Sequence, residues 1–295
     1  TTRWPVPRMD DRGTLGRWLG LSVGELDWFA DRRSWERTAP DEQLRHYTRR
    51  WLQSSHGSIR LLEAPKRRTK ALQREILHGV IDAIPVHDAA HGFRAGRSVR
   101  TGAAVHCGAD VVIRLDLESF FASIGAGRVY GIMRAAGYAD AVAHTLTALC
   151  TTVTPTAVLA TAPQVGVLRI EQRRRLLHRL REPHLPQGSP TSPALANLAA
   201  FNLDRRLSGL AEACGARYTR YADDLVLSGP RRLARTSGRL VGLIGEIVLD
   251  EGFRLNDTKT RVLTSAMCQQ VTGLVVNHHV SVPRADYDRL RAVLH

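Results

Sequence analysis

The sequence has few cysteines, almost no lysine and no long apolar run. Its four cysteines (Cys107, Cys150, Cys214 and Cys268) form no CxxC pair, which disfavours a zinc or dithiol site. Scattered single thiols are typical of a reducing compartment and predict a cytoplasmic protein. No run of 18 apolar residues is present, so neither a membrane span nor a membrane partner is expected.

Acidic residues are also scarce relative to basic ones. Among 295 residues, 42 Lys and Arg face 28 Asp and Glu, which gives a formal net charge of +14. Lysine occurs only at Lys66, Lys70 and Lys259, so the excess is carried by arginine, whose planar guanidinium binds phosphate through two hydrogen bonds. Such a balance favours a nucleic-acid partner, and the alternative is a basic protein that is merely soluble.

The order of expected elements predicts an α+β fold. The first 60 residues are expected to be largely helical, followed by a short strand at 59–62 and a helix at 69–83. The expected elements farther along are a strand at 111–116, a helix that Ser192 caps and Gly215 ends, a hairpin at 217–229 and a hairpin at 271–282. Strands and helices alternate without βαβ regularity, which favours helices packed on an antiparallel sheet.

Two adjacent carboxylates interrupt the expected hairpin at 217–229. Asp223 and Asp224 repel each other, and strands disfavour aspartate, so stability alone does not explain them. A second carboxylate, Asp116, ends the apolar strand at 111–116. If that strand pairs with the hairpin, the three carboxylates converge, and they predict a site for two Mg²⁺ ions, with Mn²⁺ as an alternative. The alternative interpretation is a polar turn.

The turn residues Ala222 and Asp223 lack the Asn-Gly or Gly-X chemistry that two-residue hairpins favour. We therefore expect a strained backbone with a positive φ at Ala222, because local rules tend to be broken at functional sites.

Six motifs in order resemble those of reverse transcriptases and cover about residues 56–280. They are HGFRAGRS (91–98), DLESFFASI (116–124), LPQGSPTSP (185–193), YADD (221–224), NDTKT (256–260) and VTGLVVN (271–277). The resemblance implies a right-hand polymerase with fingers, an antiparallel palm sheet backed by helices, and a thumb that is truncated or missing. It places an N-terminal helical extension at 1–55, fingers at 56–110 and within 141–185, the palm at 111–280 and the start of the thumb at 281–295.

The resemblance also implies a role for each matching residue. Asp116, Asp223 and Asp224, with the Leu117 carbonyl, would bind the metals, and Lys259 would act as a general acid toward the pyrophosphate. Phe121 would be the steric gate that rejects a 2′-hydroxyl. The remaining deoxynucleotide contacts would be Arg60, Lys66, Leu117, Glu118 and Gln187. Without the resemblance, Phe121 reads equally well as core, Gln187 as a loop residue, Lys66 as a solvated charge, and Lys259 as a complement to a helix dipole.

A finer resemblance is to retron reverse transcriptases. It rests on VTG (271–273), on the stretch from LRHY (44–47) to RWLQSSHGSIRLLEAPK (50–66), and on GAAVH (102–106), where Gly102 replaces an asparagine. It implies a structured noncoding RNA as primer and template, a branched RNA–DNA product, an effector protein and a role in anti-phage defence. Candidate RNA contacts are Arg94, Arg97, His106, Val271, Thr272 and Gly273, with Arg100, Arg128, Arg173, Arg174 and Arg175 as further candidates. Alternatives are another bacterial reverse transcriptase, from a group II intron or a non-retron defence system, and a catalytically idle RNA-binding scaffold.

Overall fold

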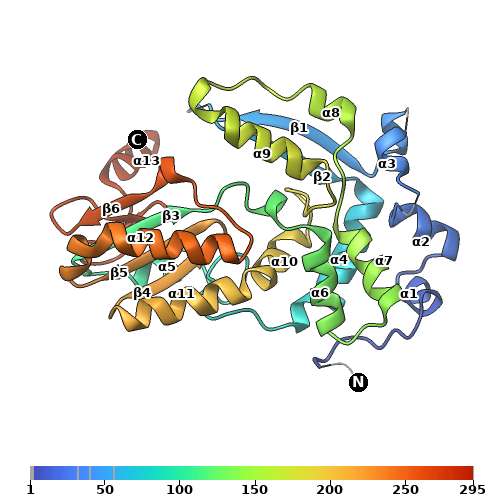
Figure 1. Cartoon of the computed structure of the whole chain (residues 1–295), viewed down its shortest axis with the longest axis horizontal. Helices are drawn as coiled ribbons and strands as arrows, with labels where there is room; N and C mark the ends of the chain where they lie inside the picture. Colours follow the sequence, from blue (N-terminus) through green and yellow to red (C-terminus); the bar gives the residue numbers. More distant parts are fainter. Residues whose placement is uncertain (1–2, 32, 40, 56, 295) are drawn as a thin grey trace. The chain divides into compact units, whose positions relative to one another are not determined.

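The structure is a computed structural model that describes residues 3–31, 33–39, 41–55 and 57–294. The chain divides into two compact units (Figure 1). Unit 1 comprises residues 1–85 and 119–199, and unit 2 comprises residues 86–118 and 200–295. Within the described ranges no helix is both long and apolar enough to cross a membrane.

Unit 1 is mainly helical and contains one two-stranded antiparallel sheet, β1–β2. Its strands are β1 (Tyr47–Gln53) and β2 (Ile59–Pro65). Its α-helices are α1 (Arg12–Trp18), α2 (Val23–Phe29), α3 (Trp35–Thr38), α4 (Arg67–Gly79), α6 (Ala126–Ala135), α7 (Asp140–Cys150), α8 (Thr156–Ala160), α9 (Ile170–Leu180) and α10 (Ser192–Ala199). Short 3₁₀ helices are η1 (Glu42–Leu44), η2 (Ile81–Ala83), η3 (Phe121–Ser123) and η4 (Val167–Arg169).

Unit 2 is built on a four-stranded antiparallel sheet with the order β4-β5-β3-β6. Its strands are β3 (Val111–Asp116), β4 (Arg217–Tyr221), β5 (Asp224–Gly229) and β6 (Arg261–Thr264), and a separate hairpin joins β7 (Gln270–Val271) to β8 (Leu274–Val275). Its helices are α5 (Val99–Ala104), α11 (Phe201–Ala213), α12 (Arg232–Asp250), η5 (Asp257–Lys259) and α13 (Arg284–Leu294). The pairing of β3 with the β4–β5 hairpin confirms the expected α+β arrangement.

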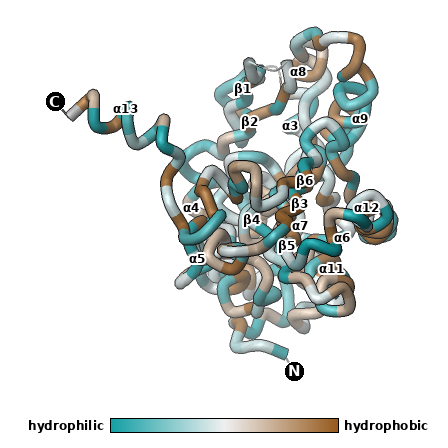
Figure 2. The backbone as a smooth tube through the Cα atoms, turned by 90° about the vertical axis from the view of Figure 1, so that its left-hand side faces the viewer, coloured by the Kyte–Doolittle hydropathy of each residue, from teal (hydrophilic) through white to brown (hydrophobic). Residues whose placement is uncertain are grey.

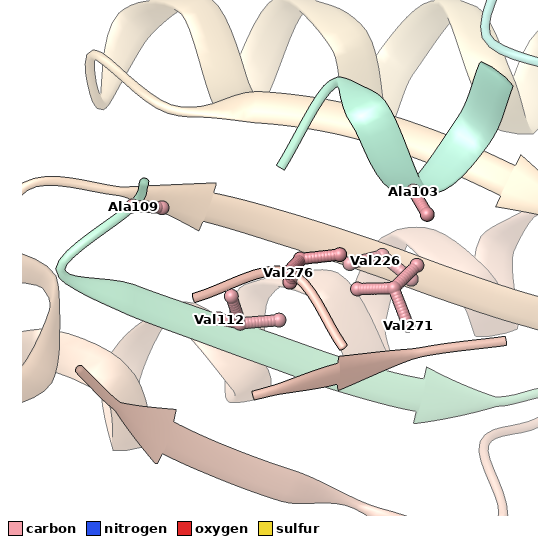
Figure 3. Close-up of a cluster of buried hydrophobic side chains, with 6 residues drawn as sticks. All are labelled: Ala103, Ala109, Val112, Val226, Val271 and Val276. Carbon is pink, nitrogen blue, oxygen red and sulfur yellow. The ribbon is translucent and has the colours of Figure 1, made fainter. Parts of the chain in front are cut away.

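The two faces of this sheet carry different residues because side chains alternate along a strand. Leu115 pairs with Leu225, and both lie on the face that α11 and α12 cover. Helix α12 is amphipathic, and its tube in Figure 2 is brown along one side and teal along the other. The opposite face carries a buried apolar cluster with α5 and β7, which Figure 3 shows, and its members are Ala103, Ala109, Val112, Val226, Val271 and Val276.

Three expectations from the sequence are wrong in detail. Residues 47–53 form strand β1 rather than a helix, and its inward-pointing Arg49 is buried in ion pairs, which hides the apolar alternation of a strand. The single helix expected to begin at Ser192 is two helices, which separate at Ala200 (φ −88°, ψ 4°). Ser192 is the first residue of α10 rather than the residue before it, and its hydroxyl donates to the Pro186 carbonyl.

Candidate active site

The aspartates meet at one end of the unit 2 sheet. Asp116, the last residue of β3, is the register partner of Asp224, the first residue of β5, so their side chains share a face. Asp223 lies in the two-residue turn that joins β4 to β5. In that turn Ala222 has φ 55°, which confirms the predicted positive φ. The convergence expected from the sequence is therefore present.

Both carboxylate oxygens of Asp116 are held by the segment that follows α12. Asn256 Nδ2 donates to Asp116 Oδ1 at 3.2 Å, and Lys259 Nζ donates to Asp116 Oδ2 at 2.8 Å. The Asn256 N–H also donates to the Asp116 carbonyl at 2.7 Å. Lys259 therefore lies at the aspartates, as the sequence predicted. Asn256 was not predicted, although its position in NDTKT, three residues before Lys259, was a usable signal.

Backbone hydrogen bonds fix the segment after Asp116. The Leu117 N–H donates to the Asp223 carbonyl at 2.9 Å, and the Glu118 N–H donates to the Arg254 carbonyl at 2.8 Å. Neither bond uses the Leu117 carbonyl, which was predicted to be a metal ligand. The side chains of Leu117 and Glu118 are both buried. Any nucleotide contact by Leu117 would therefore be made by its backbone.

The carboxylates carry more negative charge than their surroundings neutralise. Burial, together with the charges of Asp116 and Asp224, raises the pKa of Asp223 to about 6. Burial also raises the pKa of Asp224, against the opposing effect of Arg114. Carboxylates whose ionised forms are disfavoured in this way need a nearby cation at neutral pH.

The donor set fits a hard divalent cation, because all of its side-chain ligands are carboxylate oxygens. Throughout the described ranges, no three Asp, Glu, His or Cys side chains already form a metal-binding group. The Lys259 ammonium instead occupies one oxygen of Asp116. A cation bound at this oxygen of Asp116 would compete with the Lys259 ammonium for it.

The loop HGFRAGRS lies against the β4–β5 turn within unit 2. The His91 N–H donates to the Arg220 carbonyl at 2.8 Å, and the Arg220 N–H donates to the Ala89 carbonyl at 2.8 Å. A Cβ at Gly92 would lie 2.8 Å from the Ala222 backbone nitrogen, so this approach requires glycine. The loop thus supports the turn that carries Asp223.

The predicted RNA contacts divide into surface residues and core residues. Arg94 donates to Asp88 at 3.2 Å from the partly exposed surface of unit 2, and Arg97 lies 4.0 Å from the same carboxylate. In the β7–β8 turn, Thr272 (φ 47°) and Gly273 (φ 83°) adopt left-handed conformations and are at least partly exposed.

His106 and Val271 were predicted to contact RNA, and their burial contradicts contact through their side chains. His106 is fully buried between Ser228 Oγ and Thr219 Oγ1, each 2.7 Å from a ring nitrogen, and burial lowers its pKa to about 3. As a neutral ring it therefore ties the segment just after α5 to strands β4 and β5. Val271 belongs to the apolar cluster of Figure 3. A buried histidine and an exposed one look alike in sequence, which explains the error.

One group beside the turn was missed altogether. Arg220 is completely buried, and its guanidinium donates to both carboxylate oxygens of Asp204, at 2.8 and 2.7 Å. The arginine directly before YADD was a visible signal, but a charged residue is almost never fully buried without a partner, and the sequence does not show the partner.

The remaining predicted nucleotide contacts lie in unit 1. Arg60 is an exposed residue of β2, and the Lys66 ammonium donates to the carbonyls of Glu42 and Gln43. Phe121 is half-buried and lies 5.7 Å, between ring centroids, from the buried Phe120, so it is not simply a core residue. The Gln187 carbonyl accepts a hydrogen bond from the Glu63 N–H at 2.8 Å, which fixes the LPQG loop to β2.

Behind that loop lies a buried charge network. Glu63 accepts from Arg49 at 3.0 Å and contacts His184 Nε2 at 2.8 Å, and Arg49 also donates to Glu36 at 2.7 Å. Burial alone would raise the pKa of Glu63, but His184 and Arg49 lower it overall. The carboxylate therefore remains charged, and the network anchors the loop that carries Gln187.

Comparison with known proteins agrees with this arrangement. The family pattern described as "Reverse transcriptase (RNA-dependent DNA polymerase)" matches residues 52–280. The chain is 43% identical to the retron Mx65 reverse transcriptase of Myxococcus xanthus over 99% of its own length and 64% of that protein. It is 40% identical to the retron Mx162 reverse transcriptase of the same species, over 98% of the chain and 59% of the relative. With the retron Ec86 reverse transcriptase of Escherichia coli the identity is 32%, over 80% of the chain and 65% of the relative. The chain thus spans less than two thirds of the length of these relatives.

Proposed function

The chain belongs to the reverse transcriptase family, and on this premise we propose that it is a retron-type RNA-directed DNA polymerase. The observation that carries the proposal is the meeting of Asp116, Asp223 and Asp224 at the end of the unit 2 sheet. The identities of 43% and 40% to two retron reverse transcriptases support the subtype.

The three aspartates would hold two divalent cations, with Mg²⁺ as the preferred ion and Mn²⁺ as the alternative. When bound, these cations would supply activation of an attacking hydroxyl and neutralisation of the pyrophosphate leaving group. The protein's own contribution is positioning: Asn256 orients Asp116, and the turn at Ala222 orients Asp223. Lys259, once released from Asp116, donates a proton to the pyrophosphate.

The nucleotide contacts follow from the same proposal. Arg60, Lys66 and Gln187 bind the incoming deoxynucleotide, with Leu117 and Glu118 contributing from the segment after β3. Phe121 excludes a ribose 2′-hydroxyl by its bulk. The partial exposure of its ring supports a role in contacting a ligand.

The partner is a structured noncoding RNA that serves as primer and template and becomes part of a branched RNA–DNA product. Arg94, Arg97, Thr272 and Gly273 contact that RNA from the surface of unit 2. Retron membership also implies an effector protein, a role in anti-phage defence and a cytoplasmic location. We assign residues 1–55 to an N-terminal extension, 56–110 and part of 141–185 to the fingers, 111–280 to the palm, and 281–295 to the start of the thumb.

The test is to purify the natural full-length protein from its host and to analyse the nucleic acid that accompanies it. Samples are treated with RNase, DNase and debranching enzyme, and compared with the double variant Asp223→Asn, Asp224→Asn. The control is Asp250→Asn at the exposed end of α12, which removes one carboxylate charge far from the turn in sequence and leaves the three aspartates intact.

A discrete branched RNA–DNA hybrid in the wild type and the control, absent from the double variant, is the expected result. RNA alone in all three samples would replace the proposal with an RNA-binding scaffold. Unbranched or untemplated DNA would assign the chain to another class of bacterial reverse transcriptase.

A further inference from the structure

A buried ion pair lies directly behind the catalytic turn. Arg220 on β4 and Asp204 on α11 both have side chains with 0% exposure. The guanidinium donates from Nε to Asp204 Oδ1 at 2.8 Å and from Nη2 to Oδ2 at 2.7 Å, and the Tyr218 hydroxyl donates to Oδ1 at 2.9 Å. The Asp204 carboxylate therefore accepts three hydrogen bonds, and the two from Arg220 hold the guanidinium in one orientation.

The remaining terminal nitrogen of the guanidinium, Nη1, contacts the β4–β5 turn. Arg220 Nη1 donates to the Ala222 carbonyl at 3.1 Å. That carbonyl belongs to the peptide group that joins Ala222 to Asp223, so its orientation sets the direction in which the Asp223 backbone leaves the turn. Arg220 is also fixed through its own backbone, by hydrogen bonds to Ala89 and His91.

The register of the sheet places this pair on the face opposite the carboxylates. Arg220 pairs with Leu225 and shares the face that α11 covers, whereas Asp224 pairs with Asp116 on the other face. The guanidinium cannot therefore be a ligand for substrate or metal on the carboxylate face. Its contact with that face runs through the Ala222 peptide group.

Stability does not require such a pair. Replacing a buried ion pair with apolar residues of similar volume is often neutral or stabilising, while removing one partner alone is strongly destabilising. A left-handed backbone at a non-glycine residue is strained and persists only where the surroundings enforce it. The hydrogen bond from Arg220 to the Ala222 carbonyl is one such restraint on the strained residue.

We propose that Arg220, oriented by Asp204, is a positioning residue that holds the Ala222–Asp223 peptide group in the conformation that catalysis needs. This inference rests on the proposed polymerase function. It assigns the pair a role in the chemical step rather than in nucleotide binding or in folding.

The test replaces the whole polar group, so that no buried charge is left alone. The triple variant Asp204→Leu, Arg220→Met, Tyr218→Phe removes both charges and the Tyr218 hydroxyl. We expect its melting temperature to stay near that of the wild type. We expect kcat for primer extension to fall on the order of 10²-fold, as small misplacements of catalytic groups do, with the KM for deoxynucleotide changed less than about threefold. Arg220→Lys, which keeps a cation and one set of donors, should recover part of the lost kcat.

The matched control is Arg206→Met, which removes an arginine on α11 that also bonds to carboxylates, namely those of Asp250 at the end of α12 and Glu251 just beyond it. It should leave kcat unchanged. A triple variant that folds and retains wild-type kcat would overturn the proposal, as would a loss confined to KM. If the triple variant does not fold, Asp204→Asn decides the matter, because a folded Asp204→Asn protein with unchanged kcat also overturns it. An inactive wild type would instead refute the proposed function.

Discussion

At the scale of single residues, the ionised form of Asp223 lowers the stability of the folded protein at neutral pH. Its pKa is raised to about 6 because burial and the charges of Asp116 and Asp224 disfavour its ionised form. A carboxyl group with a raised pKa in the folded state binds its proton more tightly there than in the unfolded chain. Stability therefore falls as pH rises from about 4 to about 6, and it stays lower above that window.

Asp223→Asn should accordingly stabilise the protein at neutral pH in metal-free buffer. The expected gain in the free energy of unfolding at pH 7.5 is about 1–3 kcal/mol, since one pKa unit corresponds to about 1.4 kcal/mol. The gain should shrink toward zero below about pH 4, where the native carboxyl group is protonated in both states. Chemical denaturation in EDTA at several pH values measures it, and a gain that is the same at pH 4 and pH 7.5 would contradict the assignment.

Phe121 offers a second test at this scale, because its role depends only on the bulk of one ring. Phe121→Ala should raise the use of ribonucleotides relative to deoxynucleotides by about 10-fold or more, since it removes a steric clash with the 2′-hydroxyl. Single-nucleotide incorporation with each substrate gives the ratio. Phe120→Leu serves as the control in the adjacent buried ring, and an unchanged ratio in Phe121→Ala would count against the gate.

At the scale of elements, the fit of the HGFRAGRS loop against the β4–β5 turn depends on Gly92. Gly92→Ala places a Cβ 2.8 Å from the Ala222 nitrogen, which is a backbone atom and cannot rotate away. We expect a loss of about 1–3 kcal/mol in stability, as for other overpacked sites, together with reduced primer extension. Gly127→Ala in α6, where the added Cβ meets nothing within 4 Å, is the control and should be neutral or slightly stabilising.

The elements that the sequence predicted well are those whose signal is local. The strand ending at Asp116, the hairpin around YADD and the left-handed Ala222 follow from alternation and from turn chemistry. Strand β1 was missed because Arg49 points inward to Glu36 and Glu63, partners that the linear pattern does not reveal. Strand β6 was missed because it has only four residues, one exposed and three half-buried, which give almost no periodic signal.

The same limit applied to the site. Asp116, Asp223, Asp224 and Lys259 were predicted because their motifs resemble those of a known family, and the structure places them together in unit 2. The sequence did not predict Asn256 or the Arg220–Asp204 pair, and it misinterpreted His106. The role of each depends on partners that are distant in sequence and close in space.

At the scale of the whole molecule, the formal charge of +14 is the dominant property. The arginines that create it are spread over both units, and two of them, Arg94 and Arg97, are candidates for phosphate contacts on the surface of unit 2. A polyanionic partner of this surface releases counterions when it binds, so the affinity depends on salt.

RNA binding should therefore weaken linearly on a plot of log K against log salt concentration. Arg94→Ala and Arg97→Ala should each reduce the slope by about one, since each removes one phosphate contact. Arg8→Ala, which removes an exposed arginine paired with Asp10, is the control and should leave the slope unchanged. Filter binding of the noncoding RNA at 50–400 mM salt, concentrations chosen to span about a decade, measures the slopes. Equal slopes in all variants would remove Arg94 and Arg97 from the RNA interface.

The alternation of side chains between the two faces of the unit 2 sheet also determines which substitutions the chain tolerates. Along β4 and β5, neighbouring codons specify residues on opposite faces of the sheet. Arg220 and Leu225 lie on the face that α11 and α12 cover, and Asp224 and Val226 lie on the face that carries Asp116. In a library covering every substitution at 217–229, changes at the buried Leu225 and Val226 should therefore lower protein abundance, one on each face of the sheet. Changes at Asp223 and Asp224, at the end of the sheet, should instead lower the amount of DNA product while abundance is kept.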